Sequence, residues 1–214
     1  MEFLDPKLEA YVENHTMPES PVLDELNRET WLKVLQPRML SGHLQGRVLS
    51  MLSHMIKPKN ILEVGTYTGY SALCFAEGLQ EGGVIDTIDI NEELEPFVQR
   101  FLEKSGYADR IQMHVGNALD IIPTLDKEYD IVFIDADKNN YINYYNAAFE
   151  KVNKGGYIIA DNVLWSGKVL DEQELKDDPD TKTINEYNKM VLADERVENI
   201  LFPIRDGLMI ARKK

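Results

Sequence analysis

The 214-residue chain carries 23 Lys and Arg against 37 Asp and Glu, a formal net charge of −14. This acidic balance argues against a broad nucleic-acid footprint and against attraction to anionic membranes. No run approaches the roughly 20 apolar residues of a membrane span, and the chain opens with charged residues rather than an apolar signal segment. The single Cys74 cannot form an intrachain disulfide. We therefore expect a cytoplasmic protein of one domain, residues 1–214, without nucleic-acid or membrane partners.

Apolar residues recur at helical spacing in three segments before residue 57. A stretch with proline and glycine at 36–42 separates the second segment from the third. We expect these helices, within 1–56, either to cover an acceptor pocket or to build a dimer interface. Their predicted ranges are 6–14, 21–30 and 44–56.

From residue 60 onward, short apolar runs alternate with amphipathic segments. This alternation is typical of right-handed βαβ crossovers around a buried parallel sheet, so the fold class is α/β. The predicted strands are 61–64, 84–88, 111–115, 131–134 and 157–160, and helices begin near Ser71, Glu92, Ala118 and Tyr141.

The C-terminal part ends in a helix over 182–193 and two strands over 197–202 and 208–211. The link 203–207 is too short for a crossover, so these strands must pair antiparallel. The acidic segment 171–180 is predicted to be a mobile surface loop.

A strand, a tight turn and a helix over residues 63–71 predict a nucleotide-binding turn. Gly65 and Gly69 would let the backbone approach a ligand. Asp89, at the tip of the next strand, is placed to hold two ribose hydroxyls. The spacing Gly-x-x-x-Gly lacks the middle glycine that accommodates a pyrophosphate, so a nucleoside without one fits better. The alternative is that the glycines only shape the turn.

Acidic residues also follow the fourth and fifth strands. Asp135 ends one strand, and Asp161 and Asn162 end the next. Because the carboxyl ends of parallel strands line one crevice, we expect them to converge with Glu63 and Asp89. Two carboxylates and an amide carbonyl suit a partly hydrated Mg²⁺. The alternative is that the two aspartates cap the following helices.

Lys138 follows Asp135 by three residues and should point toward the same crevice. A lysine near a bound cation is a candidate general base. The alternative is a solvated lysine in the first turn of a helix.

Together these motifs resemble the cation-dependent O-methyltransferases of the caffeoyl-CoA and catechol type, which use S-adenosyl-L-methionine. The resemblance runs from Pro6 to Ala211, and its motifs stand in the family's order. It implies a Rossmann-like sheet of seven mostly parallel strands with one antiparallel edge strand, helices on both faces, and a homodimer. The motifs are 63–71, 89–91, 116–118, 135–141 and 161–165.

The resemblance also implies roles for individual residues. Asp89 would hold the ribose, Ala118 would lie at the adenine, and Glu63 and Ser71 would surround the methionine end. The cofactor contacts it implies are Ser41, Glu63, Gly65, Tyr67, Ser71, Asp89, Ala118, Asp135 and Asp137. The metal ligands are Asp135, Asp161 and Asn162, with Mg²⁺ expected and Ca²⁺ or Mn²⁺ as other options. Lys138 is the implied base, and Met39, Lys138 and Trp165 would contact the acceptor.

The expected reaction is transfer of a methyl group to a hydroxyl of a catechol-like acceptor or a hydroxycinnamate derivative. A cation bound to both vicinal oxygens would lower the hydroxyl pKa and orient one oxygen toward the sulfonium methyl. The sequence departs from the plant caffeoyl-CoA enzymes at Ser166, where those enzymes have asparagine, and in the acidic segment 171–180. Because an acidic rim would repel coenzyme A phosphates, small acceptors are favoured.

Three other functions stay open from the sequence. A nicotinamide-dependent oxidoreductase would need the missing pyrophosphate turn. A metal-dependent glycosyltransferase could use Asp135 and Asp137 as an Asp-x-Asp motif, but this leaves Asp161 and Asn162 unexplained. A non-catalytic dimer would bind S-adenosylmethionine but methylate nothing. It is disfavoured because every metal-ligand position that the resemblance implies is filled.

Overall fold

The computed structural model describes residues 5–214. Their contacts divide the chain into two compact units. The first unit combines Asn60–Gly65 with Asn117–Lys214, and the second combines the described residues up to Lys59 with Thr66–Gly116. The chain passes from one unit to the other after Lys59, Gly65 and Gly116, and the single domain over 1–214 stays a prediction.

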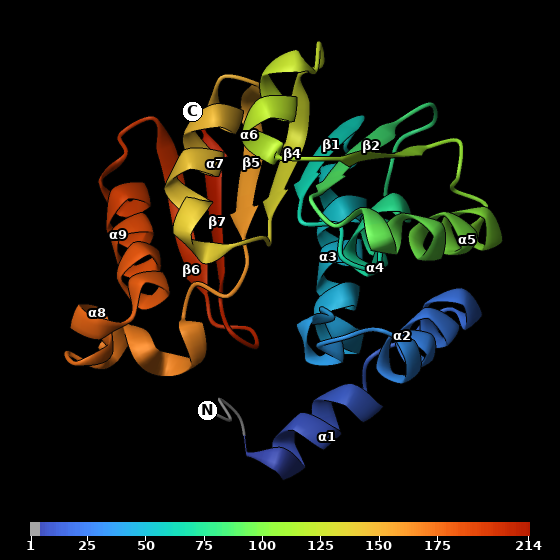
Figure 1. The fold of residues 1–214 in the computed structure, drawn as a ribbon, viewed down its shortest axis with the longest axis horizontal. Helices are drawn as coiled ribbons and strands as arrows, with labels where there is room; N and C mark the ends of the chain where they lie inside the picture. Colours follow the sequence, from blue (N-terminus) through green and yellow to red (C-terminus); the bar gives the residue numbers. More distant parts are fainter. Residues whose placement is uncertain (1–4) are drawn as a thin grey trace. The chain divides into compact units, whose positions relative to one another are not determined.

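The first unit contains five strands: β1 (Asn60–Val64), β4 (Tyr129–Ile134), β5 (Val152–Ala160), β6 (Val197–Phe202) and β7 (Leu208–Lys213). β1 and β4 pair in parallel, as do β4 and β5. β7 runs antiparallel to both β5 and β6, which confirms the antiparallel terminal hairpin. These strands lie side by side in Figure 1, from yellow β4 to red β6.

The helices of the first unit cover its strands. α7 packs on β4 and β5, and α9 packs on α7 and β6. Tyr141, Tyr145 and Tyr187 fill the space between α7 and α9, with ring planes at 82° and 75° for the two pairs that Tyr187 makes. The helices are α6 (Ala118–Ile121), α7 (Tyr141–Phe149), α8 (Glu174–Asp177) and α9 (Pro179–Ala193), with the 3₁₀ helices η3 (Ile122–Thr124), η4 (Lys138–Asn140) and η5 (Trp165–Leu170).

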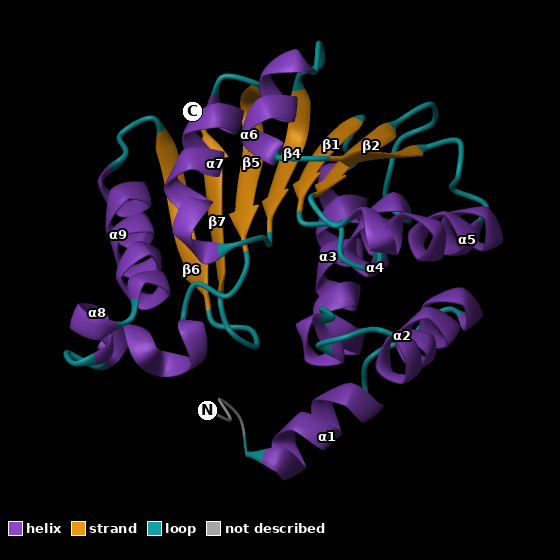
Figure 2. Cartoon of the chain, in the orientation of Figure 1, coloured by secondary structure: helices purple, strands orange, loops and turns teal. Residues whose placement is uncertain are grey.

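The second unit is mainly helical (Figure 2). Its strands β2 (Val84–Asp89) and β3 (Ile111–Val115) pair in parallel. α4 is buried along its whole length and packs against α3 and β2. Cys74 lies on this buried helix and is itself buried. The helices are α1 (Pro6–Asn14), α2 (Pro21–Lys33), α3 (Gly42–Ile56), α4 (Tyr70–Ala76) and α5 (Glu95–Ser105), with η1 (Pro37–Met39) and η2 (Glu92–Leu94).

The seven strands of residues 5–214 belong to one mixed sheet in the order β3-β2-β1-β4-β5-β7-β6. Among the strand pairs of the two units, those that β7 makes are antiparallel and the others are parallel, so the sheet is mostly parallel and Rossmann-like, as the sequence predicts. Among the described residues, no helix is both long enough and apolar enough to cross a membrane.

The predicted loop over 171–180 is wrong. Asp171 accepts hydrogen bonds from the backbone N–H groups of Gln173 and Glu174, which starts α8. Asp178 is the N-cap of α9, and Pro179 occupies the first helical position, where its missing N–H costs nothing. α9 therefore begins three residues before the predicted Lys182, because capping chemistry rather than apolar periodicity sets its start.

β5 is also longer than predicted, since it begins at Val152. Tyr129 pairs with Val152 and Ile131 with Tyr157, so β5 holds extra residues in a bulge. Gly155 adopts a φ of +83° within it. The sequence does not predict the start of β5, because apolar and polar residues do not alternate in this glycine-containing stretch.

Candidate functional site

The strand ends of the first unit form an aligned row. Val64 of β1 pairs with Ile134 of β4, and Ile134 pairs with Ala160 of β5. Each next residue continues the ladder: the N–H of Asp135 donates to the Val64 carbonyl at 2.8 Å, and that of Asp161 to the Ile134 carbonyl at 3.0 Å. The predicted convergence of Asp135 and Asp161 at one sheet edge is therefore present within this unit.

Gly65 opens this row, and its position requires a glycine. Its φ is +103°, and a Cβ built on it would lie 2.0 Å from the carbonyl oxygen of Asp135. Any side chain would push β1 and β4 apart at their ends. Glu63, two residues earlier on β1, is fully buried.

Lys138 is buried at the same edge. Its Nζ donates to Asp135 Oδ1 at 3.1 Å and to the Tyr141 hydroxyl at 2.5 Å, and the residue is 8% exposed. The alternative of a solvated lysine at the start of a helix is therefore wrong. Nζ also lies 5.8 Å from the ring centre of Trp165, so Lys138, Asp135 and Trp165 share one environment.

Tyr141 connects the lysine to the end of β5, a link the sequence analysis missed. Its hydroxyl accepts from Lys138 and donates to the backbone carbonyl of Asp161 at 2.9 Å. Burial, together with the nearby Asp135 and Asp161, raises the pKa of Tyr141 well above its usual value. The tyrosine stays neutral and keeps its proton for the Asp161 carbonyl. The spacing Lys-x-x-Tyr at a helix start, which puts both side chains on one face, could have indicated it.

Asp137 and Ala118 also lie in the first unit. The Asp137 carboxylate accepts from the Tyr144 hydroxyl at 2.5 Å and from the Asn140 side chain at 2.6 Å. Burial raises the pKa of Tyr144, with this hydrogen bond as the next cause. Ala118 is buried and begins α6, where the Asn117 side chain caps the helix by accepting from the Leu119 N–H at 3.0 Å.

The turn over 162–167 follows β5 and carries two predicted site residues. Asn162, Trp165 and Ser166 have φ values of 58°, 47° and 53°. The left-handed region costs a non-glycine residue of order 1–3 kcal/mol, and such strain gathers at functional sites when surrounding structure enforces it. Asp161 Oδ1 accepts from the Asn162 N–H at 2.7 Å, which bends the chain directly after the strand.

Capping does not explain the two aspartates. The N-cap residue of η4 is Asp137, and that of η5 is Leu164. Among the described residues, no three His, Cys, Asp or Glu side chains form a group that could hold a metal ion. The predicted ligand set has two carboxylates and one amide, so any cation there would depend on Asn162 as its third protein donor.

Two predicted cofactor residues of the second unit, Tyr67 and Asp89, meet at the end of β2. Its Oδ2 accepts from the Tyr67 N–H at 2.7 Å, and its Oδ1 from the Asn91 N–H at 2.9 Å. Two backbone donors thus fix the carboxylate plane. The Thr66 and Thr87 hydroxyls, 2.6 Å apart and buried, hold the start of the turn to β2.

Tyr67 also reaches back toward the N-terminal region. Its hydroxyl donates to the Leu35 carbonyl at 3.1 Å, which ties the turn to the segment before η1. Burial raises the pKa of Tyr67. Ser41 and Ser71 are buried, whereas Met39 is 58% exposed. Within this unit the structure joins Tyr67 and Asp89 directly; a shared site with the residues of the first unit stays a prediction.

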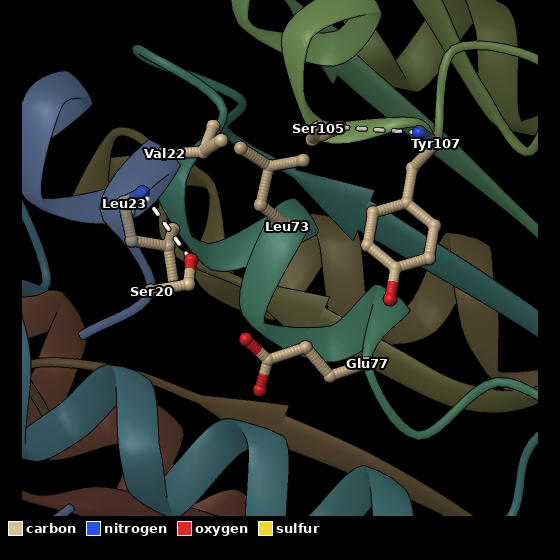
Figure 3. Close-up of a pocket in the computed structure, with 7 residues that line it drawn as sticks. All are labelled: Ser20, Val22, Leu23, Leu73, Glu77, Ser105 and Tyr107. Atoms are coloured by element: carbon tan, nitrogen blue, oxygen red, sulfur yellow. Dashed lines mark hydrogen bonds between the residues drawn. The ribbon is translucent and has the colours of Figure 1, made fainter. Parts of the chain in front are cut away.

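A separate hollow of about 230 Å³ lies in the second unit, between α2, α4 and the chain after α5 (Figure 3). None of the predicted site residues lines it. Its carboxylate, Glu77, is already engaged by Arg47 at 2.9 Å and by the Ser50 hydroxyl at 2.5 Å. This hollow is a gap in helix packing and takes no part in the predicted site. Its lining residues are Ser20, Val22, Leu23, Leu73, Glu77, Ser105 and Tyr107.

Known proteins resemble the chain over nearly its whole length. The sequence profile of the O-methyltransferase family matches residues 13–214. Caffeoyl-CoA O-methyltransferase 5 of Nicotiana tabacum is 35% identical over 222 aligned residues, covering 98% of this chain and 91% of that protein.

Solved structures of O-methyltransferases also superpose on this chain. An O-methyltransferase from Bacillus cereus, in complex with SAH, superposes with a TM-score of 0.89 at 28% identity, covering 97% of each chain. TomG from Streptomyces achromogenes, involved in tomaymycin synthesis and solved with SAM, has a TM-score of 0.87 at 26% identity, covering 97% of this chain and 96% of TomG. The chain belongs to the O-methyltransferase family and is an O-methyltransferase.

Proposed function

We propose that this enzyme transfers a methyl group from S-adenosylmethionine to a hydroxyl of a catechol-like small molecule, with a divalent cation at Asp135, Asp161 and Asn162. The observation that carries the proposal is the row of strand ends in the first unit. There a buried lysine, two carboxylates and an amide follow neighbouring strands. An O-methyltransferase needs such polar groups where the acceptor hydroxyl reacts.

The proposed cofactor contacts include residues of each unit. Gly65 ends one segment of the first unit and is bonded to Thr66 of the second, so one continuous turn supplies both. Each oxygen of Asp89 accepts one backbone N–H. A carboxylate has about four acceptor positions, which leaves capacity for the two ribose hydroxyls. The remaining proposed contacts are Ser41, Glu63, Gly65, Tyr67, Ser71, Ala118, Asp135 and Asp137.

The donors fit a hard divalent cation. Asp135 and Asp161 supply carboxylate oxygens and Asn162 an amide oxygen, the ligand type that Mg²⁺, Ca²⁺ and Mn²⁺ prefer. When bound, such a cation would lower the pKa of the acceptor hydroxyl and fix its orientation. The left-handed φ of Asn162 and the bond from its N–H to Asp161 hold these two residues in one defined turn.

Lys138 is the proposed proton acceptor. Its ammonium form has three donors, of which Asp135 and Tyr141 take two. The third direction can meet the acceptor hydroxyl, and in the neutral form Nζ would accept its proton. Asp135 and Tyr141 set where Nζ lies, so proton transfer occurs at a fixed point.

Trp165 and Met39 are the proposed walls of the acceptor pocket. The only basic residue of η5, Lys168, pairs with Glu174 at 3.0 Å and with Asp178 at 3.2 Å. Its charge is therefore already balanced by carboxylates of the acidic segment. Phosphates of a coenzyme A thioester would meet this acidic surface, so a small catechol or a free hydroxycinnamate is the favoured acceptor.

We also propose a homodimer that uses the N-terminal helices. Trp31 of α2 and Met51 and Met55 of α3 are 60%, 61% and 73% exposed. A contiguous patch of such side chains would be typical of an association site. Light scattering coupled to size-exclusion chromatography tests this directly. If the protein is a monomer in solution, the dimer interface is excluded, and the other predicted role of these helices, covering the acceptor pocket, remains.

The central experiment measures methyl transfer to a panel of catechols and matched monophenols, with S-adenosylmethionine, in Mg²⁺ and in EDTA. We expect turnover of catechols alone, its loss in EDTA and its return with excess Mg²⁺. Asp161→Asn should lose turnover, whereas Asp126→Asn, on an exposed loop of the same unit, should keep it. Full activity in chelator would remove the cation from the proposal, and equal turnover of monophenols would remove the catechol acceptor.

A further inference from the structure

The strained turn over 162–167 is held in place by segments far away in the sequence. The N–H of Val163 donates to the Gly207 carbonyl at 3.2 Å, and the N–H of Leu164 donates to the Asp206 carbonyl at 2.8 Å. The Ser166 N–H donates to Asp206 Oδ1 at 2.5 Å. One loop, between β6 and β7, thus accepts three backbone donors of the turn.

Two further contacts hold the turn, one from this loop and one from α9. Gly207 has a φ of +86°, and a Cβ built on it would lie 2.6 Å from Leu164 Cγ, so the loop packs directly on the turn. On the other side, the Asn188 side chain of α9 donates to the Val163 carbonyl at 2.8 Å. The turn is therefore fixed from both sides by groups outside it.

The turn has no comparable support of its own. Its internal hydrogen bonds are Trp165 N–H to the Asn162 carbonyl at 3.2 Å and Gly167 N–H to the Leu164 carbonyl at 2.9 Å. These close two tight bends but do not offset three left-handed non-glycine residues. Without the loop, the chain would relax toward ordinary φ values and move Trp165.

We propose that Asp206 is a positioning residue for methyl transfer: its side chain and carbonyl hold the 162–167 turn in the conformation that presents Asn162 and Trp165 to the reaction. This rests on the proposed function, in which these two residues serve the cation and the acceptor. The hydrogen bonds of Asp206 go to the backbone N–H groups of Ser166 and Leu164, so it acts on Asn162 and Trp165 through these two residues. A displacement of about 1 Å at a reacting group can lower the rate by about 100-fold. Support of the turn by Asp206 should therefore affect the rate of methyl transfer.

The test uses Trp165 as its own reporter. In a Trp31→Phe background, Trp165 is the one remaining tryptophan, so acrylamide quenching and the emission maximum report its environment without substrate, cofactor or metal. Asp206→Ala removes the acceptor for the Ser166 N–H, and we expect stronger quenching and a red shift. Asp206→Asn keeps a side-chain oxygen for that bond and should restore the parental values. Asp126→Ala serves as the control for loss of a surface charge.

Kinetics supply the second measurement. We expect Asp206→Ala to lower kcat/KM for a catechol by about 10- to 100-fold, with unchanged affinity for S-adenosylmethionine and recovery in Asp206→Asn. Unchanged quenching in Asp206→Ala overturns the proposal, and so does altered quenching with parental kcat/KM. If the parent methylates no catechol, the proposed function fails, and quenching alone decides whether Asp206 holds the turn. Should Asp206→Ala not fold, Asn188→Ala loosens the same turn from α9 and is expected to increase quenching.

Discussion

Two turns that follow strands carry most of the candidate site, and they are held in different ways. The turn over 66–71 is closed by its own chain, since Gly69 N–H donates to the Thr66 carbonyl at 2.8 Å, and its first two residues are tied to Thr87, Asp89 and Leu35. The turn over 162–167 depends on α9 and on the loop between β6 and β7. The first has one left-handed non-glycine residue, Tyr67, and the second has three.

The difference shows how strain is distributed over a functional site. A turn with glycines at most of the demanding positions stores less strain, so substitutions of its non-glycine residues should affect ligand binding more than folding. A turn with left-handed Asn, Trp and Ser needs support from remote segments, so distant substitutions should alter its function. The following experiments test this division.

The largest effect is expected at Gly65, which combines a positive φ with a close approach to the Asp135 backbone. Gly65→Ala should lower the free energy of unfolding by roughly 2–4 kcal/mol, because the new Cβ collides with backbone and the φ becomes strained. Urea denaturation measures it. Gly82→Ala is the matched control: its φ is +69°, but nothing lies within 4 Å of the added Cβ, so only the strain is added. Equal losses in both variants would show that the approach of Gly65 to Asp135 can relax.

Lys138→Ala should lower kcat by roughly 100-fold, within the usual range for a general base, with little change in affinity for S-adenosylmethionine. Lys189→Ala, an exposed lysine on α9, is the control and should behave as the parent. A Lys138→Ala enzyme whose pH–rate profile overlays that of the parent at every pH would reduce Lys138 to a structural partner of Asp135.

Asp89→Ala should weaken binding of S-adenosylmethionine by ~1.5 to 3 kcal/mol, through loss of charge-assisted hydrogen bonds. Titration calorimetry measures this, and Asp109→Ala, an exposed aspartate of the same unit, controls for the lost charge. The KM for the acceptor should change little. An unaltered affinity would remove Asp89 from the cofactor site and leave it the role of closing the turn at Tyr67.

The smallest effects concern pH, and they have opposite signs at two aspartates. A hydrogen bond from Thr181 lowers the pKa of Asp178 to about 2, so its contribution to stability is present above the unfolded pKa and is lost as pH falls toward 2. Burial raises the pKa of Asp206. Its charged form is therefore disfavoured in the fold, and the stability linked to its protonated form is lost as pH rises through the raised pKa.

Chemical denaturation between pH 3 and pH 6 separates the two groups. Asp178→Asn should reduce the loss of stability on acidification, and Asp206→Asn should reduce the loss on raising the pH. Parallel pH profiles in both variants would contradict the assigned directions.

Much of the fold follows from local chemistry that the sequence displays. Apolar runs of strand length that alternate with amphipathic segments force a parallel sheet, and the five-residue link 203–207 forces the terminal hairpin. Asp135, Asp161 and Asn162 could be placed together because they follow strands of one sheet, whose carboxyl ends share an edge. The sequence leaves the burial of Lys138 open, since a lysine at a helix start is solvated unless neighbouring elements cover it.

Tertiary structure decided what depends on residues distant in the chain. The sequence predicts a loop over 171–180 because acidic residues are common in loops, but Asp171, Asp178 and Pro179 use that polarity to start two helices. Likewise, no local pattern predicts that the turn after β5 takes its shape from Asp206 and Asn188. Those contacts exist because β7 pairs antiparallel with β5, which brings the loop before β7 beside the end of β5. The sequence by itself determined which chemical groups stand at the strand ends, whereas the packing of remote segments determined the conformation in which they are held.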